Sequence, residues 1–206
     1  MYARSTSFLG DPHRIDEAAR FLADKAMPAL LGMDGFVGLS MLADRTSGRC
    51  IVTSSFADLA ALRRSASEMR GIRARTADIL QSPQTLEEWR IALLHRLQAA
   101  PAGARTRVTW IDTDPARLDA ALDAYAESVV PRLSDEPGFC STSVLADVET
   151  GRTATAITFA DDAALQQALG RLCPLLERYA ERHRSQVTDE ATFDLVLARL
   201  SVPETV

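Results

Sequence analysis

The sequence contains few cysteines and no long apolar run. Its three cysteines, Cys50, Cys140 and Cys173, are odd in number and irregularly spaced, which argues against a disulfide framework or a zinc site and favours reduced thiols. No segment approaches the roughly 18 uninterrupted apolar residues of a transmembrane helix. The first ten residues lack the apolar core of a signal peptide. We therefore expect a cytoplasmic protein with no membrane partner.

An excess of positive charge is also missing. The chain has 206 residues and a formal net charge of −5, with 23 lysines and arginines against 28 acidic residues. Nucleic acid is therefore not an expected partner. Gly-x-Gly-x-x-Gly and Walker patterns are absent, so nucleotide binding is not supported. The three histidines share no local spacing, and no metal site is predicted.

The dominant feature that is present is an internal repeat. The stretch "GFVGLSMLADRTSGRC" (35–50) returns as "GFCSTSVLADVETGRT" (138–153), with a constant shift of 103 residues. This period is longer than the roughly 20–50 residues of solenoid repeats, so it indicates two copies of a small domain. We place the first copy at residues 1–100 and the second at 104–206, joined by the Pro-, Gly- and Ala-containing stretch 98–104.

Each copy is predicted to follow the order βαββαβ, which is the ferredoxin-like plan of the α+β class. An Asp-Pro pair starts the first helix of each copy, a glycine turns each hairpin, and an aspartate caps each second helix. A proline in the last turns of the first helix is expected to kink it. These residues are Asp11-Pro12 and Asp114-Pro115, Gly48 and Gly151, Asp58 and Asp161, and Pro28 and Pro131.

The strand at 36–43 is apolar on both faces, although helices on one side of a sheet need only one apolar face. The second face is therefore predicted to pack on a second sheet, which the repeat supplies. We expect the two repeats to form an intramolecular, pseudo-dimeric α+β barrel. The chain would then be a monomer with an internal pseudo-dimer, and pairing into a homodimer through outer edges stays open.

The repeated "GF…S.L.D…GR" hairpin and the helix ends "MP.L" and "VPRL" resemble the antibiotic biosynthesis monooxygenase family, in the dimeric α+β barrel superfamily. More closely, the chain resembles the tandem two-copy form of that family. The resemblance implies a ligand in an apolar cleft between helices and sheet. It also implies oxygenase chemistry without a cofactor, or haem binding. Family oxygenases use an asparagine with a tryptophan, but this sequence contains no asparagine, so no catalytic residue is carried over.

Five residues are candidates for lining a substrate site. Trp110, Tyr125 and Tyr179 belong to the second copy, and an indole with two phenols suits a flat phenolic or quinone-like ligand. Trp110 could equally be a core residue, and the tyrosine hydroxyls could bind backbone or water. His95 and Trp89 are expected on one face of the strand 89–97, together with Ile91, Leu93 and Leu97. His95 is either a ligand contact or a satisfied residue at the core's rim.

Six arginines keep register in the repeats, namely Arg4, Arg107, Arg49, Arg152, Arg96 and Arg199. They are expected to mark pseudo-symmetric salt bridges with Asp44 and Asp147. The functional hypothesis is a cofactor-independent monooxygenase, without metal or flavin, acting on a small aromatic, polyketide-like or quinol-like substrate. The alternative is a non-catalytic barrel protein that binds a small molecule or haem, and a purely structural pseudo-dimer is a third hypothesis. Whether the protein is an enzyme stays open.

Overall fold

Both repeats fold in the predicted βαββαβ order, in a computed structural model that describes residues 1–200. The elements of the first repeat are β1 (Tyr2–Leu9), η1 (Pro12–Arg14), α1 (Ile15–Phe21), η2 (Leu22–Ala26), α2 (Met27–Leu31), β2 (Phe36–Ala43), β3 (Arg49–Phe56), α3 (Leu59–Glu68), α4 (Arg70–Leu80) and β4 (Gln84–Arg96). The elements of the second repeat are β5 (Arg105–Asp112), η3 (Pro115–Arg117), α5 (Leu118–Ala124), η4 (Tyr125–Val129), α6 (Val130–Ser134), β6 (Phe139–Asp147), β7 (Arg152–Phe159), α7 (Asp162–His183) and β8 (Gln186–Leu200).

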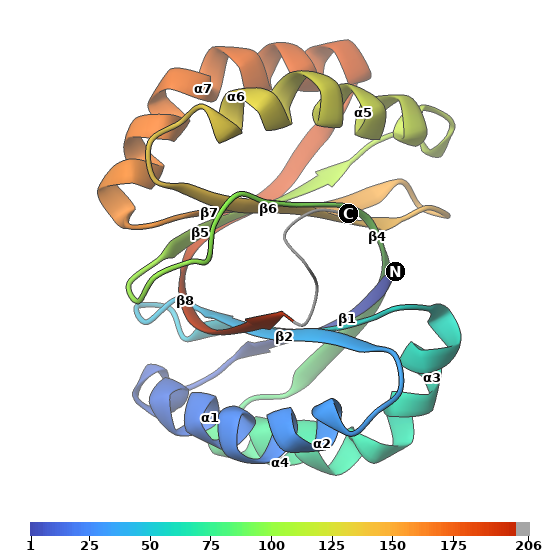
Figure 1. Cartoon of the computed structure of the whole chain (residues 1–206), viewed down its shortest axis with the longest axis vertical. Coiled ribbons are helices and arrows are strands. Elements are labelled where there is room, and N and C mark those ends of the chain that lie inside the picture. Colours follow the sequence, from blue (N-terminus) through green and yellow to red (C-terminus); the bar gives the residue numbers. More distant parts are fainter. Residues whose placement is uncertain (201–206) are drawn as a thin grey trace. The chain divides into compact units, whose positions relative to one another are not determined.

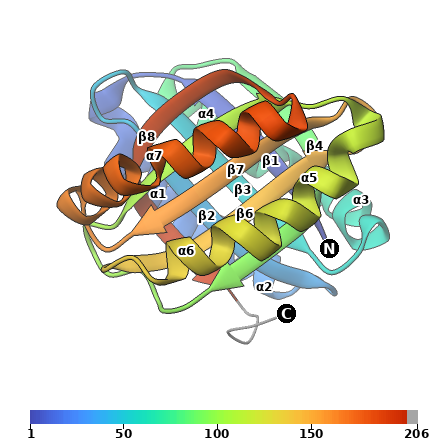
Figure 2. The same ribbon diagram turned by 90° about the horizontal axis from the view of Figure 1, so that it is seen from above.

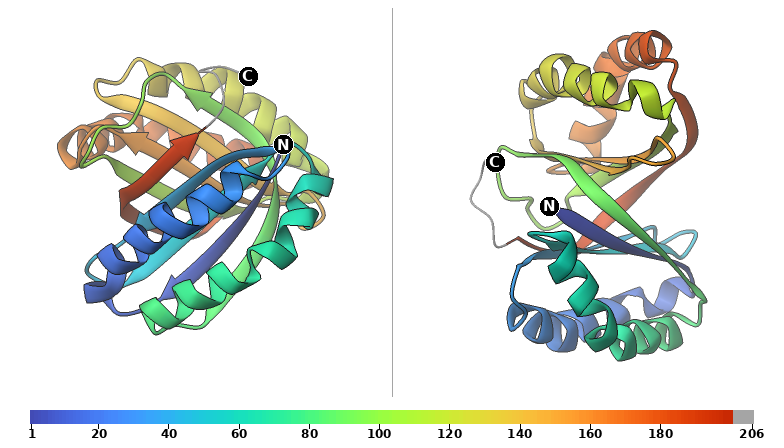
Figure 3. Two further views of the ribbon diagram at one scale, coloured as in Figure 1. Left: turned by 60° about the horizontal axis from the view of Figure 1, so that its bottom comes forward. Right: turned by 90° about the vertical axis from the view of Figure 1, so that its right-hand side faces the viewer.

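The strands hydrogen-bond in the order β1-β3-β2-β8-β5-β7-β6-β4, the closed order expected of a pseudo-dimeric α+β barrel. The chain divides into two compact units. The first unit is Met1–Trp89 with the described residues from Phe193 onward, and the second is Arg90–Thr192. In each unit the helices cover one face of the sheet (Figure 1). Figure 2 shows α5, α6 and α7 over the strands of the second unit, and Figure 3 shows the helices of the first unit over theirs.

The last strand of each repeat contributes to both units. Strand β4 belongs to the first unit up to Trp89, and its continuation pairs with β6 in the second unit, where Leu94 lies opposite Ser143. Strand β8 does the opposite. It begins in the second unit, and its end pairs with β2 of the first unit, where Leu195 lies opposite Leu42. Each repeat therefore completes its sheet with a strand from the other. The repeat limits at residues 1–100 and 104–206 stay a prediction.

The predicted capping residues start the helices. The carboxylate of Asp11 accepts a hydrogen bond from the backbone N–H of His13 at 2.9 Å, and Asp114 repeats the arrangement. Asp58 and Asp161 cap α3 and α7 through the backbone N–H groups three residues later. These carboxylates satisfy N–H groups that have no partner inside a helix.

The expected proline kink takes the form of a π-helical turn in both repeats. The turns η2 and η4 directly precede the short helices that contain Pro28 and Pro131. Proline has no N–H to donate to the preceding turn, so a wider turn is tolerated there. The second helix differs between the repeats. It divides into α3 and α4 at Met69, close to Gly71, whereas α7 runs unbroken with Pro174 at the equivalent position.

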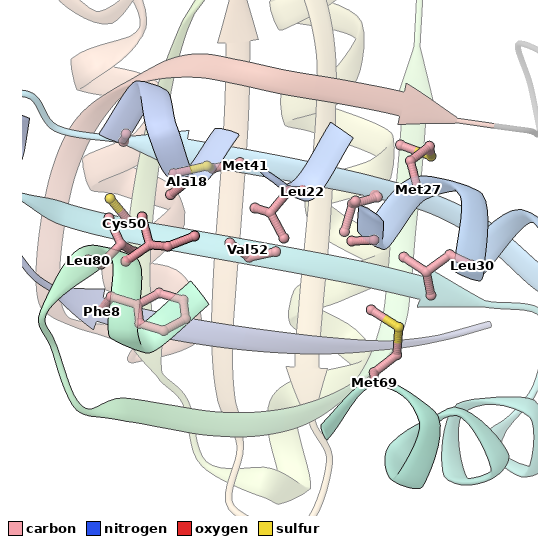
Figure 4. Packing of buried hydrophobic residues seen from close by; sticks show 14 of the residues in the cluster. Phe8, Ala18, Leu22, Met27, Leu30, Met41, Cys50, Val52, Met69 and Leu80 are labelled. Carbon is pink, nitrogen blue, oxygen red and sulfur yellow. The ribbon is translucent and has the colours of Figure 1, made fainter. Parts of the chain in front are cut away.

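Each unit has its own hydrophobic cluster between helices and sheet. In the first unit, Leu22 and Leu30 from the helical segment lie in one cluster with Met41, Val52 and Met69 (Figure 4). The second cluster includes Tyr125, Phe139 and Leu172. Among the helices of residues 1–200, none combines the length and apolar character needed to cross a bilayer.

Candidate functional site

The first unit contains a small pocket between its helices and its sheet, with a cavity volume of about 30 Å³, which is the space of about one water molecule. Small-molecule sites typically enclose roughly 300–1,000 Å³, so a substrate requires the helices and the sheet to move apart. The walls here are mostly apolar, with two arginines and three hydroxyl side chains among them. The lining residues are Arg4, Thr6, Phe8, Leu22, Leu39, Val52, Ser54, Met69, Ile72, Arg73 and Thr76.

Arg4 on β1 is a buried guanidinium held by four hydrogen bonds. Its Nη2 lies 2.7 Å from Oε1 of Glu88 and 3.0 Å from the Leu62 carbonyl oxygen, and Nε lies 3.2 Å from the same Glu88 oxygen. Nη1 donates to Ser65 Oγ at 3.0 Å. The Arg4 side chain is 4% exposed. A guanidinium has five N–H donors, so four bonds leave one N–H on Nη1.

Arg73 on α4 is held much less tightly. Its Nη2 donates to the Ala66 carbonyl at 2.9 Å, and no ion pair to it occurs within residues 1–200. Burial lowers the pKa of Arg73, and the positive charges of Arg4 and Arg70 lower it further, while Glu88 opposes them. The wall formed by α4 therefore carries a positive charge that its surroundings compensate poorly.

The second unit contains a different pocket, with a cavity volume of about 20 Å³. It is lined by Ile111, Thr113, Leu118, Ala121, Leu122, Tyr125, Val144, Thr153, Thr155, Tyr179 and Ser185. The rings of Tyr125 and Tyr179 meet edge to face, with centroids 5.8 Å apart. The Tyr179 hydroxyl donates to the Ala121 carbonyl at 2.9 Å, and burial raises the pKa of Tyr179 to about 12. Both phenols are thus neutral at ordinary pH, since burial also raises the pKa of Tyr125.

The two pockets differ because of substitutions at equivalent positions. The second repeat has Tyr125 in place of Leu22, Leu176 in place of Arg73, and Tyr179 in place of Thr76. Tyr125 and Tyr179 line the pocket of the second unit, whereas Leu176 does not. The second pocket is consequently shifted toward residues such as Thr113 and Ser185, whose counterparts do not line the first pocket.

The structure brings Tyr125 and Tyr179 together but does not add Trp110 to them. Ile111, the next residue on β5, lines the tyrosine pocket, so alternation along the strand turns Trp110 to the opposite face of the sheet. Trp110 is 6% exposed. Trp89 is buried as well, and its Nε1 donates to Ser5 Oγ at 2.8 Å. The assignment of these residues to a ligand site stays a prediction.

His95 and Trp89 do not share a strand face. A register shift in β4 between Ile91 and Leu93 interrupts the alternation on which that expectation depended. His95 instead faces α6, where its Nε2 lies 3.0 Å from Ser134 Oγ, and its ring stacks on Phe139 with centroids 6.1 Å apart. His95 lines neither pocket, and neither lining includes a histidine or cysteine. The pockets thus offer no imidazole or thiolate to a haem iron.

Arg4 and Arg107 do not form the salt bridges with Asp44 and Asp147 that were expected of the repeated arginines, and for the other four arginines that expectation stays a prediction. Arg4 pairs with Glu88, and Arg107 pairs with Glu190 of β8. The reason is geometric: Asp44 accepts hydrogen bonds within its hairpin turn, from the Thr46 backbone and the Ser47 hydroxyl. The arginines lie toward the other end of their strands, opposite Ser54 and Ile157 of β3 and β7.

No protein-family model matches the chain. Two proteins of Mycobacterium tuberculosis (strain ATCC 25618 / H37Rv) match it over its whole length. Rv2558 is 40% identical over 207 residues, which cover 100% of this chain and 88% of that protein. Rv2557 is 36% identical over 206 residues, which cover 100% and 92%. The chain belongs to the family of these mycobacterial proteins.

Solved structures share the fold of this family member. A candidate monooxygenase from Lactobacillus acidophilus superposes with a TM-score of 0.70 at 12% identity, covering 97% of this chain and 95% of that one. An anthrone oxidase-like protein gives 0.64 at 16% identity, covering 98% and 94%. A haem-degrading enzyme from Listeria monocytogenes gives 0.56 at 10% identity, covering 95% and 99%. At these identities the likeness shows the fold, which is that of the antibiotic biosynthesis monooxygenases.

Arg73 was not predicted as a site residue from the sequence, and Arg4 was expected only in a salt bridge. The available signal was the repeat itself, because Arg73 stands where the second copy has Leu176. A charged residue on the inner stripe of a helix in one copy alone indicates a local use for that charge. Tyr125 and Tyr179 were predicted as site residues instead, because they are aromatic.

Proposed function

We propose that the protein is a cofactor-independent monooxygenase that acts on a small, flat, electron-rich aromatic or polyketide-like substrate in the pocket of the first unit. The observation that carries this proposal is the fixed guanidinium of Arg4 on the wall of a mostly apolar pocket. Support also comes from the fold, which the chain shares with an anthrone oxidase-like protein and a candidate monooxygenase.

The chemistry requires the protein to bind the substrate anion and to exclude water. A substrate with an acidic CH₂ group next to a carbonyl loses a proton to solvent water before it is enclosed and forms an enolate, which donates electrons to dioxygen. A proton from solvent is taken up again when the hydroperoxide forms. The resulting carbon-bound hydroperoxide loses water, so that R₂CH₂ and O₂ become R₂C=O and H₂O. One oxygen atom enters the ketone, the other leaves as water, and two C–H bonds are broken.

Arg4 is the group suited to stabilise the enolate oxygen. Four hydrogen bonds hold its guanidinium in place, and the remaining N–H on Nη1 is available to the substrate. A donor that is fixed before the reaction needs no reorganisation when charge develops, and it is strengthened in an apolar surrounding. Phe8, Leu22 and Met69 supply apolar contacts for a flat substrate.

Oxygen uptake with anthrone and with a dihydroquinone, in chelator-treated buffer, tests the proposal. Removing one such donor typically costs about 100-fold or more in turnover, so Arg4→Gln is expected to lose about that factor. Arg107→Gln is the matched control, because Arg107 is the repeat counterpart and lines neither pocket. Circular dichroism establishes that both variants are folded. Equal losses in the two variants, or no uptake across a broad phenolic panel, would contradict the proposal.

A non-catalytic small-molecule binder is the second candidate. The observation in its favour is that no carboxylate or imidazole is among the residues lining the first pocket, so that wall offers no group to accept a substrate proton. Ligand binding without oxygen uptake would support this candidate. Titration with haemin, followed by its Soret band, tests the haem-binding variant separately.

A further inference from the structure

The second helix of the first repeat is interrupted where it lines the pocket, whereas α7 of the other repeat is continuous. Helix α3 ends at Glu68, Met69 departs from ideal helical geometry with ψ −5°, and α4 begins at Arg70. The Met69 side chain lies in the hydrophobic cluster of the first unit (Figure 4). Gly71 follows, and a Cβ on it would meet nothing within 4 Å, so close packing does not require a glycine there. A glycine beside a helix break lowers the cost of bending at this point.

Hydrogen bonds fix the pair of helices α3 and α4 at its two ends. Arg4 on β1 holds α3 through Ser65 Oγ at 3.0 Å. At the end of α4, the Leu80 carbonyl accepts from the backbone N–H of Asp11 at 2.9 Å. Between these anchors, residues 70–79 make no hydrogen bond to the sheet or to α1 within the part of the chain that the structure describes. Packing of apolar side chains is therefore the main contact of that segment with the sheet.

The corresponding segment of the second unit is held more firmly, because its inward-facing side chains are larger or more apolar. Where the first repeat has Ile72, Arg73 and Thr76, the second has Leu175, Leu176 and Tyr179. The Tyr179 hydroxyl donates to the Ala121 carbonyl of α5 at 2.9 Å. The Thr76 hydroxyl instead donates to the Ile72 carbonyl in its own helix at 2.8 Å. Among residues 1–200, the first unit therefore has no counterpart of the bond between α7 and α5.

The surroundings of Arg73 also weaken the position of α4 against the sheet. Arg73 is half-buried, and burial lowers its pKa, with the charges of Arg4 and Arg70 adding to this effect. Glu88 offsets part of it. The closed arrangement thus disfavours the guanidinium charge, and movement of α4 away from the sheet would return that charge to water. The cavity of about 30 Å³ behind α4 shows in addition that packing there is incomplete.

We infer that residues 69–79 of the first unit form a movable wall, which bends at Met69 and Gly71 and moves away from the sheet to open the pocket. Four of the eleven lining residues belong to this wall, so its movement enlarges the cavity directly. The inference rests on the proposed function only in taking this pocket as the substrate site. The equivalent segment of the second unit stays closed, since its helix is continuous and bonded to α5.

Cysteine labelling of the native protein tests the inference. Met69 and Leu172 occupy equivalent positions and each is 6% exposed, so Met69→Cys and Leu172→Cys place matched thiols on the two helices. Both variants carry Cys173→Ser, which removes the exposed native thiol. N-ethylmaleimide at pH 8 is the reagent, and peptide mass spectrometry gives the rate at each position relative to the unfolded protein.

We expect the thiol at position 69 to react at least about tenfold faster than the thiol at position 172, because local opening exposes only the first. Equal rates would overturn the inference. Cys50 is buried in the same unit and serves as an internal reference. If Cys50 reacted as fast as position 69, the whole unit would be unfolding and the wall would not move by itself.

A substitution that favours the helical backbone locates the hinge. Gly71→Ala should slow labelling at position 69 about two- to fivefold, because alanine leaves helical geometry less readily than glycine does. Gly170→Ala in α7 is the matched control, since a Cβ there also meets nothing within 4 Å, and it should leave that rate unchanged. Equal effects of the two substitutions would contradict a hinge at Gly71.

Hydrogen exchange of the unmodified protein gives a second measurement that needs no variant. We expect the amides of residues 72–76 to exchange faster than those of residues 175–179 at the same pH. Equal or slower exchange in the first segment would count against the movable wall. Neither experiment uses a substrate or dioxygen, so failure of the oxygenase proposal and failure of this inference give different results.

Discussion

The hydroxyl oxygen of Tyr125 lies 3.1 Å from Oγ1 of Thr142, at the two positions where the first repeat has Leu22 and Leu39. The second repeat has thus replaced an apolar contact between helix and sheet by a buried hydrogen bond. Both residues are buried, with Tyr125 5% exposed and Thr142 fully enclosed. This pair is one structural difference between the two repeats at equivalent positions.

We expect Tyr125→Phe to lower the free energy of unfolding by about 1–2 kcal/mol, because it leaves the Thr142 hydroxyl buried without its partner. The double variant Tyr125→Phe/Thr142→Val removes both polar groups and should recover part of that loss. Urea unfolding followed by circular dichroism measures both values. A double variant whose loss equals the sum of the single losses would show that the two side chains are not coupled.

Arg4 and Arg107 occupy equivalent positions but differ in burial, with 4% and 24% of their side chains exposed. We expect Arg4→Leu to cost about 2 kcal/mol of stability, since it removes four hydrogen bonds and leaves the buried Ser65 oxygen without its donor, whereas the Leu62 carbonyl still accepts from the Ser65 hydroxyl. Arg107→Leu should cost roughly 1 kcal/mol or less, because its partner Glu190 is half exposed and can be hydrated. Thermal unfolding of the two variants in one buffer makes the comparison, and equal losses would contradict it.

Gly48 and Gly71 should respond in opposite ways to alanine. Gly48 has φ +77°, and a Cβ there would lie 1.9 Å from the Gly10 carbonyl oxygen, so Gly48→Ala is expected to cost about 2 kcal/mol or more. A Cβ on Gly71 would meet nothing within 4 Å in helix α4, so Gly71→Ala should stabilise by roughly 0.5–1 kcal/mol. Urea midpoints decide both signs. A stabilising Gly48→Ala would mean that the hairpin relaxes without cost.

The three cysteines should differ in reactivity toward a thiol reagent. Burial raises the pKa of Cys50 to about 11, and burial also raises the pKa of Cys140. Cys173 is exposed, although its hydrogen bond and charge contact with Glu177 raise its pKa above the ordinary value. At pH 8 we expect one reactive thiol in the native protein, slower than a free cysteine, and three after unfolding. Cys173→Ser should remove the native reaction, and Glu177→Gln should accelerate it.

Much of the fold follows from local sequence signals. The Asp-Pro pairs, the second capping aspartates and the hairpin glycines predicted helix starts and turns that the structure contains. These signals act over a few residues, and the repeat allowed each to be checked at a second position. The order βαββαβ and the barrel class are confirmed for this reason.

The sequence predicted less accurately which face of a strand each candidate residue occupies, because this depends on the register of strand pairing. One shift in β4 between Ile91 and Leu93 was enough to separate Trp89 from His95, and no residue type marks that shift. Trp110 was grouped with the tyrosines by chemistry, while strand alternation turns it away from them. A single sequence does not reveal where a strand slips by one residue.

The sequence by itself determined the duplicated α+β plan, since capping carboxylates, turn glycines and apolar periodicity act through neighbouring residues. Only the tertiary structure decided which repeat has a charged pocket and which partners its arginines have. The bond between Arg4 and Glu88 joins residues 84 positions apart, through a last strand whose halves serve two units. Such contacts depend on which strands pair and on how side chains pack together. They form only when residues far apart in the sequence are brought together by folding.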